Sequence, residues 1–131
     1  FIQAFSKIGL IPDSGGTYTL PRLVGMQKAS ALMMLGDKVS ATEAEAMGMI
    51  YKSASAEEYM ELAQKTASKL SVMPTLALAR TKALLNATYQ NDLQAQLSLE
   101  DKYQTECGHS YDYREGTAAF LEKRKPEFKG E

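Results

Sequence analysis

The stretch from Gly9 to Gly25, GLIPDSGGTYTLPRLVG, places one carboxylate, Asp13, between a proline and a Gly-Gly pair. An Asp shortly before a helix can cap it, because its oxygens accept backbone N–H bonds and the helix dipole favours its charge. A carboxylate in an apolar pocket can instead act as an acid or base, because desolvation raises its pKa toward neutrality. Both roles are open for Asp13 from the residues alone.

The residues around this carboxylate suit chemistry as well as capping. Leu10, Ile11 and Pro12 precede it and would supply the apolar wall that desolvates an acid or base. Gly15 and Gly16 follow it, and residues without a side chain let a bulky ligand approach the backbone. We therefore expect these five residues to bind the substrate if Asp13 is catalytic.

Other reactive side chains are scarce. The chain has one cysteine, Cys107, and one histidine, His109, which are too few for a disulfide framework or for a zinc or iron–sulfur site. His109 follows Gly108 in a polar stretch that is typical of a loop, so a nucleophile activated by histidine is not expected. Proton chemistry should fall to a carboxylate, a tyrosine or a lysine, and we expect no metal.

Composition narrows the class of protein. The chain has 131 residues, 44% of them hydrophobic, which suits one compact unit with a core. Its 15 Lys and Arg against 16 Asp and Glu are spread along the chain, so nucleic acid is not an expected partner. No apolar run approaches the roughly 20 residues of a membrane span, and no signal peptide opens the chain. We expect a soluble, cytoplasmic protein that does not bind membranes.

Patterning predicts six or seven helices and at most two short strands. Short strands are expected at FIQAF, residues 1–5, and at MIYKSA, residues 49–54. Helices are expected from Thr17 to near Gly25 and over MQKASALMMLG, residues 26–36. The chain begins inside the apolar FIQAF stretch, with no polar lead-in, so we expect it to be a piece of a longer chain.

Capping signals predict where the later helices begin. Ser40 with Glu43, Ser55 with Glu58 and Asp112 with Glu115 each have the spacing of a capping box. Pro74 suits the first turn of another helix, and a further one is expected from Asp92 to about Cys107. The final helix should end before Pro126. The fold class expected from these signals is mainly α.

Three stretches stand out together: GLIPDSGGTYTLPRLVG, the following ALMMLGDKVSATEAEAMGMI, and YREGTAAFLEKRKPEFKG near the end of the chain. They resemble the crotonase family, the enoyl-CoA hydratases and isomerases, and the last stretch is similar to the family's C-terminal end. The resemblance covers essentially the whole chain but only the C-terminal half of a full-length member. It implies the C-terminal helical part of an α/β crotonase fold, whose spiral β core is largely missing here.

The resemblance also implies a division of the chain by role. Residues 1–69 correspond to a remnant of the crotonase core, with the catalytic loop at residues 9–17. Residues 70–131 correspond to the helical region through which members of the family assemble into trimers, which often pair into hexamers. We expect the whole protein to be a homotrimer or hexamer.

Comparison with the family gives Asp13 and Phe5 distinct roles. Hydratases of the family use two glutamates, and the second falls at Phe5, eight residues before Asp13. Members that shift conjugated or ring double bonds carry an Asp at the position of Asp13. The resemblance implies an acyl-CoA isomerase that shifts a double bond or opens a ring epoxide of a CoA thioester, in phenylacetate degradation or a related pathway. Asp13 would transfer the proton, and Phe5 would form part of the pocket wall.

The family pattern further implies what binds CoA. The acyl-CoA is the substrate, and no additional cofactor is implied. Phe120 and Lys123, three residues apart, are candidates for contacting the adenine and phosphate of a neighbouring subunit's CoA. A packed Phe beside a solvated Lys is the structural alternative. The oxyanion-hole donors and most of the CoA pocket belong to the N-terminal half of the family, so we expect the isolated chain to be inactive.

Two other functions stay open from the sequence. An enoyl-CoA hydratase would draw a carboxylate from the preceding half to activate water. A non-catalytic helical module would use the same fold for assembly alone.

Overall fold

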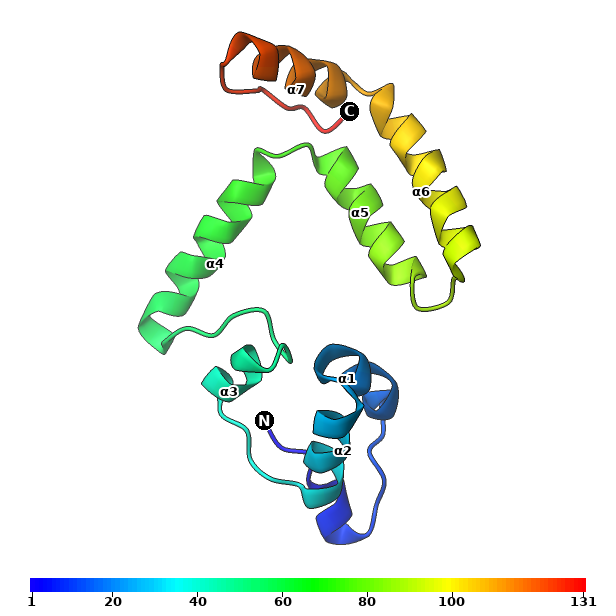
Figure 1. Ribbon diagram of the computed structural model, residues 1–131. Helices are drawn as coiled ribbons and strands as arrows, with labels where there is room; N and C mark the ends of the chain where they lie inside the picture. Colours follow the sequence, from blue (N-terminus) through cyan, green and yellow to red (C-terminus); the bar gives the residue numbers. More distant parts are fainter. The chain divides into compact units, whose positions relative to one another are not determined.

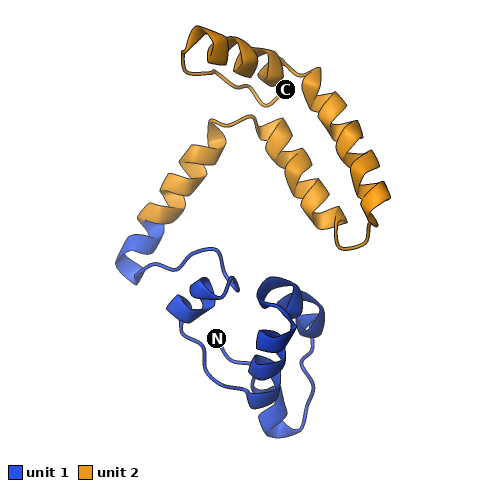
Figure 2. Ribbon diagram, viewed as in Figure 1, with its two compact units in different colours: residues 1–60 blue, residues 61–131 orange.

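The computed structural model describes residues 1–131 and contains seven α-helices and one 3-10 helix, without a β-strand (Figure 1). The predicted mainly α class is confirmed. Two compact units, Phe1–Met60 and Glu61–Glu131, divide the chain, and their boundary lies inside α4, Ala56–Ser71 (Figure 2). The division by role between residues 69 and 70, which falls near the C-terminal end of the same helix, stays a prediction.

Unit 1 is built around two adjacent helices. Its elements are the 3-10 helix η1 (Ala4–Ile8), α1 (Gly16–Val24), α2 (Met26–Leu35) and α3 (Ala41–Ala46). The helices α1 and α2 pack against each other, and η1 packs against α2. The buried apolar residues of this unit are Leu20, Ala29, Val39 and Ala44. This core holds the loop between η1 and α1, which carries Asp13.

Unit 2 contains the long helices of the second half. After α4 come α5 (Thr75–Ala87), α6 (Leu93–Gly108) and α7 (Tyr111–Glu122). The helix α6 packs against α5 and also contacts α7. Only Ala119 and Asp112, both on α7, are buried in this unit. None of the helices combines the length and apolar composition that crossing a membrane requires.

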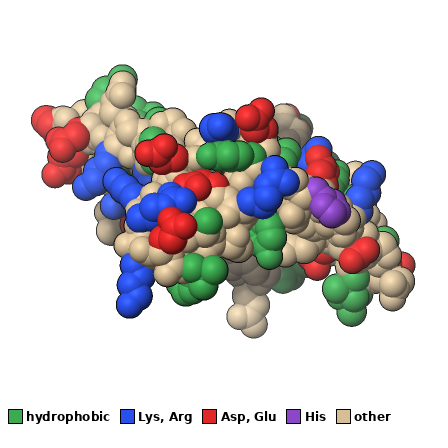
Figure 3. All heavy atoms as spheres, turned by 90° about the horizontal axis from the view of Figure 1, so that it is seen from above, with side chains coloured by type: hydrophobic (Ala, Val, Ile, Leu, Met, Phe, Trp, Pro, Cys, Tyr) green, Lys and Arg blue, Asp and Glu red, His purple; other side chains and the backbone are tan.

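Large apolar side chains are exposed throughout both units. No large side chain is fully buried, and examples of exposure are Met34 at 74%, Leu85 at 63% and Leu93 at 75%. Figure 3 shows hydrophobic side chains interspersed with acidic and basic ones on the face that it draws. Exposed apolar surface of this extent is typical of regions that other protein surfaces cover.

Several predicted caps are confirmed. Ser40 Oγ accepts from Glu43 N at 3.2 Å, and the Glu43 carboxylate accepts from Ser40 N at 2.9 Å, which completes a capping box at α3. Ser55 Oγ accepts from Glu58 N at 3.2 Å at the start of α4. Asp92 caps α6 by accepting from Ala95 N at 2.8 Å. These local bonds fix where three of the helices begin.

The strand predicted for FIQAF is wrong. Only Ile2 forms a β-bridge, with Lys38, and the residues after Gln3 turn into η1. Gly9 ends this helix with φ 74°, and its N–H bonds to the carbonyls of Phe5 and Ser6. Without a neighbouring strand to supply a ladder, the backbone forms local hydrogen bonds instead.

The strand predicted for MIYKSA is also wrong, because this segment is tied to α3. The amides of Met49 and Ile50 both donate to the carbonyl of Ala44. Ser53 donates from its amide and its hydroxyl to Glu45 Oε2, at 2.7 and 2.6 Å. These bonds lower the pKa of Glu45, chiefly through the hydroxyl of Ser53.

The capping box predicted for Asp112 and Glu115 is wrong as well. The helix α7 begins two residues earlier than that box requires, with Ser110 as its cap, and Ser110 Oγ accepts from Tyr113 N at 3.0 Å. Asp112 is buried inside the first turn, 4% exposed. Its carboxylate bonds to residues far along the chain, which i, i+3 spacing does not reveal.

Two glycines with similar backbone angles allow a test of packing in unit 1. Gly36 (φ 65°) and Gly9 (φ 74°) both end helices, but a Cβ on Gly36 would lie 3.2 Å from the Gln3 carbonyl oxygen. Nothing lies within 4 Å of a Cβ on Gly9.

Gly36→Ala and Gly9→Ala should each lower the free energy of unfolding by about 1–2 kcal/mol, because alanine disfavours the left-handed conformation. Gly36→Ala should lose about 1 kcal/mol more, because the backbone of Gln3 must move. Urea unfolding measures both, and equal losses would contradict the packing described here.

Candidate active site

Asp13 lies on the loop that joins η1 to α1. Hydrogen bonds hold this loop at both ends: Leu10 N donates to Phe5 O at 3.0 Å, and Gly16 N donates to Asp13 O at 2.8 Å. The loop is therefore anchored to the helix that carries Phe5 and to the helix that follows Asp13. This places the two positions singled out by the sequence on one connected segment of unit 1.

Backbone conformation after Asp13 is unusual. Ser14 has φ 51° and Gly15 has φ 76°, so two consecutive residues are left-handed. A residue other than glycine pays roughly 1–2 kcal/mol for this conformation, and such strain is concentrated at functional sites. Ser14 and Gly15 form the turn that leads the chain from Asp13 into α1.

Asp13 does not cap α1. The cap residue is Gly15, no side chain bonds to the first turn, and the amides of Tyr18 and Thr19 donate to the carbonyl of Gly15. The Asp13 side chain is exposed. The capping alternative is therefore wrong for this structure, and the carboxylate is available to a ligand.

The predicted apolar wall is accessible in the chain by itself. Leu10 is 58% exposed and Ile11 is 82% exposed, whereas Pro12 and Phe5 are half-buried. A Cβ on Gly16 would make ordinary contacts, 3.7 Å from Pro12 Cβ, so space alone does not require a glycine there. The exposed apolar residues leave room for a ligand or another protein surface beside Asp13.

The two predicted CoA contacts lie at the end of α7, in unit 2. Phe120 is 83% exposed, and Lys123 ends the helix as an exposed residue with φ 54°. The structural alternative of a packed Phe is wrong for this structure, because the ring of Phe120 is almost fully accessible. Asp13 and Phe5 belong to unit 1, and each group of residues is described within its own unit.

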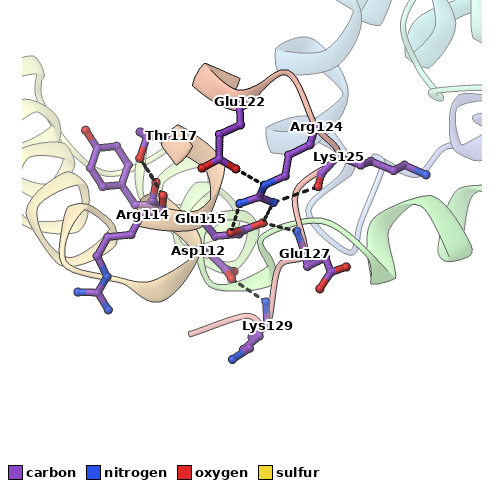
Figure 4. Close-up of polar contacts among 10 residues, drawn as sticks. Asp112, Arg114, Glu115, Thr117, Glu122, Arg124, Lys125, Glu127 and Lys129 are labelled. Atoms are coloured by element: carbon purple, nitrogen blue, oxygen red, sulfur yellow. Dashed lines mark hydrogen bonds and ion pairs between the residues drawn. The ribbon is translucent and has the colours of Figure 1, made fainter. Parts of the chain in front are cut away.

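The C-terminal tail, residues 124–131, folds back along α7 through a set of polar contacts. Arg124 binds the Glu115 carboxylate with both Nη atoms, at 2.5 and 2.9 Å, and its Nε binds Glu122 at 2.5 Å. Glu127 N also donates to Glu115, at 2.9 Å. Figure 4 shows the Arg124 guanidinium between the two carboxylates.

A buried carboxylate completes this arrangement. Asp112 accepts from Lys129 N at 2.6 Å (Figure 4) and, on its other oxygen, from Gly130 N at 2.9 Å. Phe128 lies over Gly116, where a Cβ would come within 3.3 Å of its ring. We call the contacts of Asp112, Glu115, Glu122 and Arg124 with each other and with residues 127–130 the tail clasp. Sequence patterning missed it, because its bonds to the tail span up to 18 residues.

An apolar groove of about 760 Å³ lies beside the clasp in unit 2. Its lining includes Leu76 of α5, Cys107 of α6, Phe120 of α7 and Phe128 of the tail. The volume and composition are typical of sites that accept apolar groups. No cluster of three or more His, Cys, Asp or Glu side chains is placed to hold a metal ion.

Comparison with known proteins connects both regions to one family. The family model described as enoyl-CoA hydratase/isomerase matches residues 1–131. The chain belongs to the enoyl-CoA hydratase/isomerase family. The predicted resemblance to the crotonases is thereby confirmed.

Relatives within the enoyl-CoA hydratase/isomerase family include both kinds of enzyme. The chain is 46% identical over 130 residues to the 1,2-epoxyphenylacetyl-CoA isomerase of Escherichia coli (strain K12), covering 99% of this chain and 50% of the relative. It is 44% identical to a protein of Rhodobacter capsulatus named probable enoyl-CoA hydratase, covering 99% of this chain and 51% of that relative. The chain thus spans about half the length of the curated relatives it matches.

A solved structure in this family shares the fold. The enoyl-CoA hydratase/isomerase from Cupriavidus metallidurans CH34 superposes with a TM-score of 0.88 at 35% identity, over 99% of this chain and 49% of that one. The helices described above therefore correspond to about half of a crotonase-fold chain. The rest of that solved chain has no counterpart among the 131 residues.

The tail clasp makes a pH-dependent contribution that can be measured. Hydrogen bonds from Arg124 and from Glu127 N lower the pKa of Glu115 to about 2. A carboxyl whose folded pKa is depressed stabilises the fold above its unfolded pKa, and this contribution is lost as the pH falls toward the folded value. The advantage of wild type over Glu115→Gln should be constant from about pH 7 to 5.5 and shrink between about pH 4.5 and 2.

Urea unfolding at a series of pH values tests this expectation. Glu61→Gln, which removes an exposed carboxylate of α4, controls for the change in net charge. A difference between wild type and Glu115→Gln that is the same at every pH would show that the Arg124–Glu115 pair does not form.

Proposed function

We propose that the whole protein containing this chain is an acyl-CoA isomerase that shifts a double bond or opens a ring epoxide of a CoA thioester. The observation that carries the proposal is the loop at Asp13, where a strained backbone presents an exposed carboxylate that caps no helix. The similarity to a 1,2-epoxyphenylacetyl-CoA isomerase supports the substrate class and a place in phenylacetate degradation or a related pathway. The reaction needs no cofactor besides the CoA thioester itself.

The proposed chemistry requires one group that removes a proton and returns it elsewhere. Addition of water needs a second group to activate the water, and position 5, where the family's hydratases place their second glutamate, holds Phe5. A phenyl ring there cannot transfer protons, but it excludes water and so raises the basicity of a nearby carboxylate. The pair Asp13 and Phe5 therefore favours isomerisation over hydration.

The other residues of the loop would bind the acyl group. Leu10, Ile11 and Pro12 form the apolar side of the pocket in this proposal, and Gly15 and Gly16 allow the substrate to approach the backbone. The remaining parts would come from a preceding half like that of the family's longer members. These parts include the two N–H donors that hold the thioester enolate, an interaction worth about 10²–10³-fold in rate for each donor.

In the proposed assembly, α7 binds the nucleotide end of CoA. Phe120 would stack on the adenine and Lys123 would pair with a phosphate, in the active site of a neighbouring subunit. Their exposure supports this role, because both side chains are accessible at the end of one helix. The assembly we propose is a homotrimer or a hexamer of two trimers.

An enoyl-CoA hydratase is the second candidate function. The 44% identity to a protein named probable enoyl-CoA hydratase favours it almost as strongly as the similarity to the isomerase favours the first. In a hydratase, a carboxylate outside this chain would activate the water, and Asp13 would serve as its partner or have no part in the reaction.

Substitution of Asp13 separates these functions. In the whole protein, Asp13→Asn should lower the rate of double-bond or epoxide isomerisation by about 10²- to 10⁴-fold, the usual contribution of a positioned acid–base group. Asp37→Asn, at another exposed aspartate of unit 1, is the matched control and should leave the rate unchanged. Fast hydration of crotonyl-CoA that survives Asp13→Asn would refute the isomerase proposal.

The 131-residue chain alone is expected to show no isomerase activity. It contains Asp13 but, on the proposal above, neither the oxyanion donors nor most of the CoA pocket. A coupled or direct ultraviolet assay with enoyl-CoA and epoxide substrates measures this. Turnover by the purified chain that disappears with Asp13→Asn would contradict the expectation.

A further inference from the structure

The tail determines which face of α7 is accessible. Running antiparallel to the helix, it meets Ala119 through Arg124 N, then Glu115 through Glu127 N, then Asp112 through Lys129 N. These positions recur every three or four residues, so the tail covers one face of the helix. Residues of the other face stay accessible, with Tyr113 56%, Phe120 83% and Leu121 79% exposed.

The clasp fixes the backbone around Lys123. Its two neighbours, Glu122 and Arg124, are bonded to each other, and Arg124 is bonded twice more to Glu115. Lys123 N also donates to Phe120 O, at 3.3 Å. Lys123 is the left-handed C-cap of α7, closed by this bond and by Arg124 N, which donates to Ala119 O at 3.0 Å, and the clasp bonds the residues on either side of it.

The clasp also gives the two basic side chains at the end of α7, Lys123 and Arg124, different surroundings. Two carboxylates neutralise Arg124, whereas Lys123 is exposed and makes no contact within the clasp. An exposed ring and an exposed ammonium group therefore stand three residues apart on a rigid helix end. A planar base and a phosphate group are the complementary chemistry for such a pair.

We propose that Asp112, Glu115 and Arg124 are positioning residues, which hold Phe120 and Lys123 in the arrangement that binds the nucleotide end of CoA. Asp112 anchors the tail at one end of α7, and Arg124 anchors the opposite end. None of the three touches the nucleotide. This inference rests on the CoA-binding role given to α7 in the proposed function, and it identifies the residues on which that role depends.

Binding of CoA and of pantetheine to the whole protein tests the proposal. Calorimetry should show that Arg124→Gln weakens the affinity for CoA by about 3- to 10-fold, because one or two additional side chains must then be ordered on binding. Pantetheine lacks the nucleotide, so its affinity should not change. Glu115→Gln should also weaken the affinity for CoA. Arg124→Lys keeps the charge, so it should lose less affinity than Arg124→Gln. If Arg124→Gln does not fold, Arg124→Lys still allows the effect to be measured.

Arg114→Gln is the matched control for these variants. It removes an arginine from the same helix, and Figure 4 shows the Arg114 guanidinium pointing away from the clasp. Its affinity for CoA should equal that of wild type. Equal weakening of CoA and pantetheine by Arg124→Gln, or unchanged affinity for both, would overturn the proposal, as would a loss with Arg114→Gln as large as with Arg124→Gln.

The measurement is independent of the reaction that the protein catalyses. Asp13→Asn should lower isomerisation by the same 10²- to 10⁴-fold and leave the affinity for CoA intact, because free CoA lacks the acyl group on which Asp13 is proposed to act. Failure of the isomerase assignment would thus appear in turnover alone. Failure of the positioning role would appear in the ratio of CoA to pantetheine affinity.

Discussion

The chain forms no strand ladder, so its buried backbone polar groups bond within helices, at turns, or through isolated pairs of distant residues such as Phe1 with Val39. Helices satisfy most of these groups internally, and side chains such as those of Ser40, Asp92 and Ser110 satisfy part of the ends. Where no helix can form, single side chains replace a sheet: Glu45 binds the segment after α3, and Asp112 binds the tail. The same constraint leaves the apolar faces of the helices without a sheet to cover them.

How well the fold could be predicted depends on how far apart along the sequence the hydrogen-bonding partners lie. Helix ends set by i, i+3 hydrogen bonds were predictable from spacing, and Ser40 with Glu43 is the clearest example. Spacing was misleading at Asp112, because a carboxylate in a first turn can cap or can reach elsewhere, and burial decides which. Short apolar runs such as FIQAF were misleading for a related reason, because a strand needs a partner that this chain does not supply.

The sequence singles out the residues of the candidate site but not the conformation of its backbone. Asp13 and its glycines stand out by composition, whereas the left-handed conformation of Ser14 has no sequence signal, since serine seldom adopts it. That conformation separates Asp13 from the helix it would otherwise cap. Two left-handed residues in succession thus convert a common structural aspartate into an accessible one. The family assignment is consistent with a ligand beside this loop, and the proposed isomerase chemistry depends on that accessibility.

The contact between Gly116 and Phe128 also constrains how the sequence can diverge. Because a Cβ at position 116 would come within 3.3 Å of the aromatic ring, a larger residue on α7 requires a smaller one in the tail. Among homologous sequences the two positions should covary, with an aromatic residue at 128 only where 116 is glycine. Divergent members that lose this pairing would have tails that lie differently on α7, and such a change would leave the loop at Asp13 unaltered.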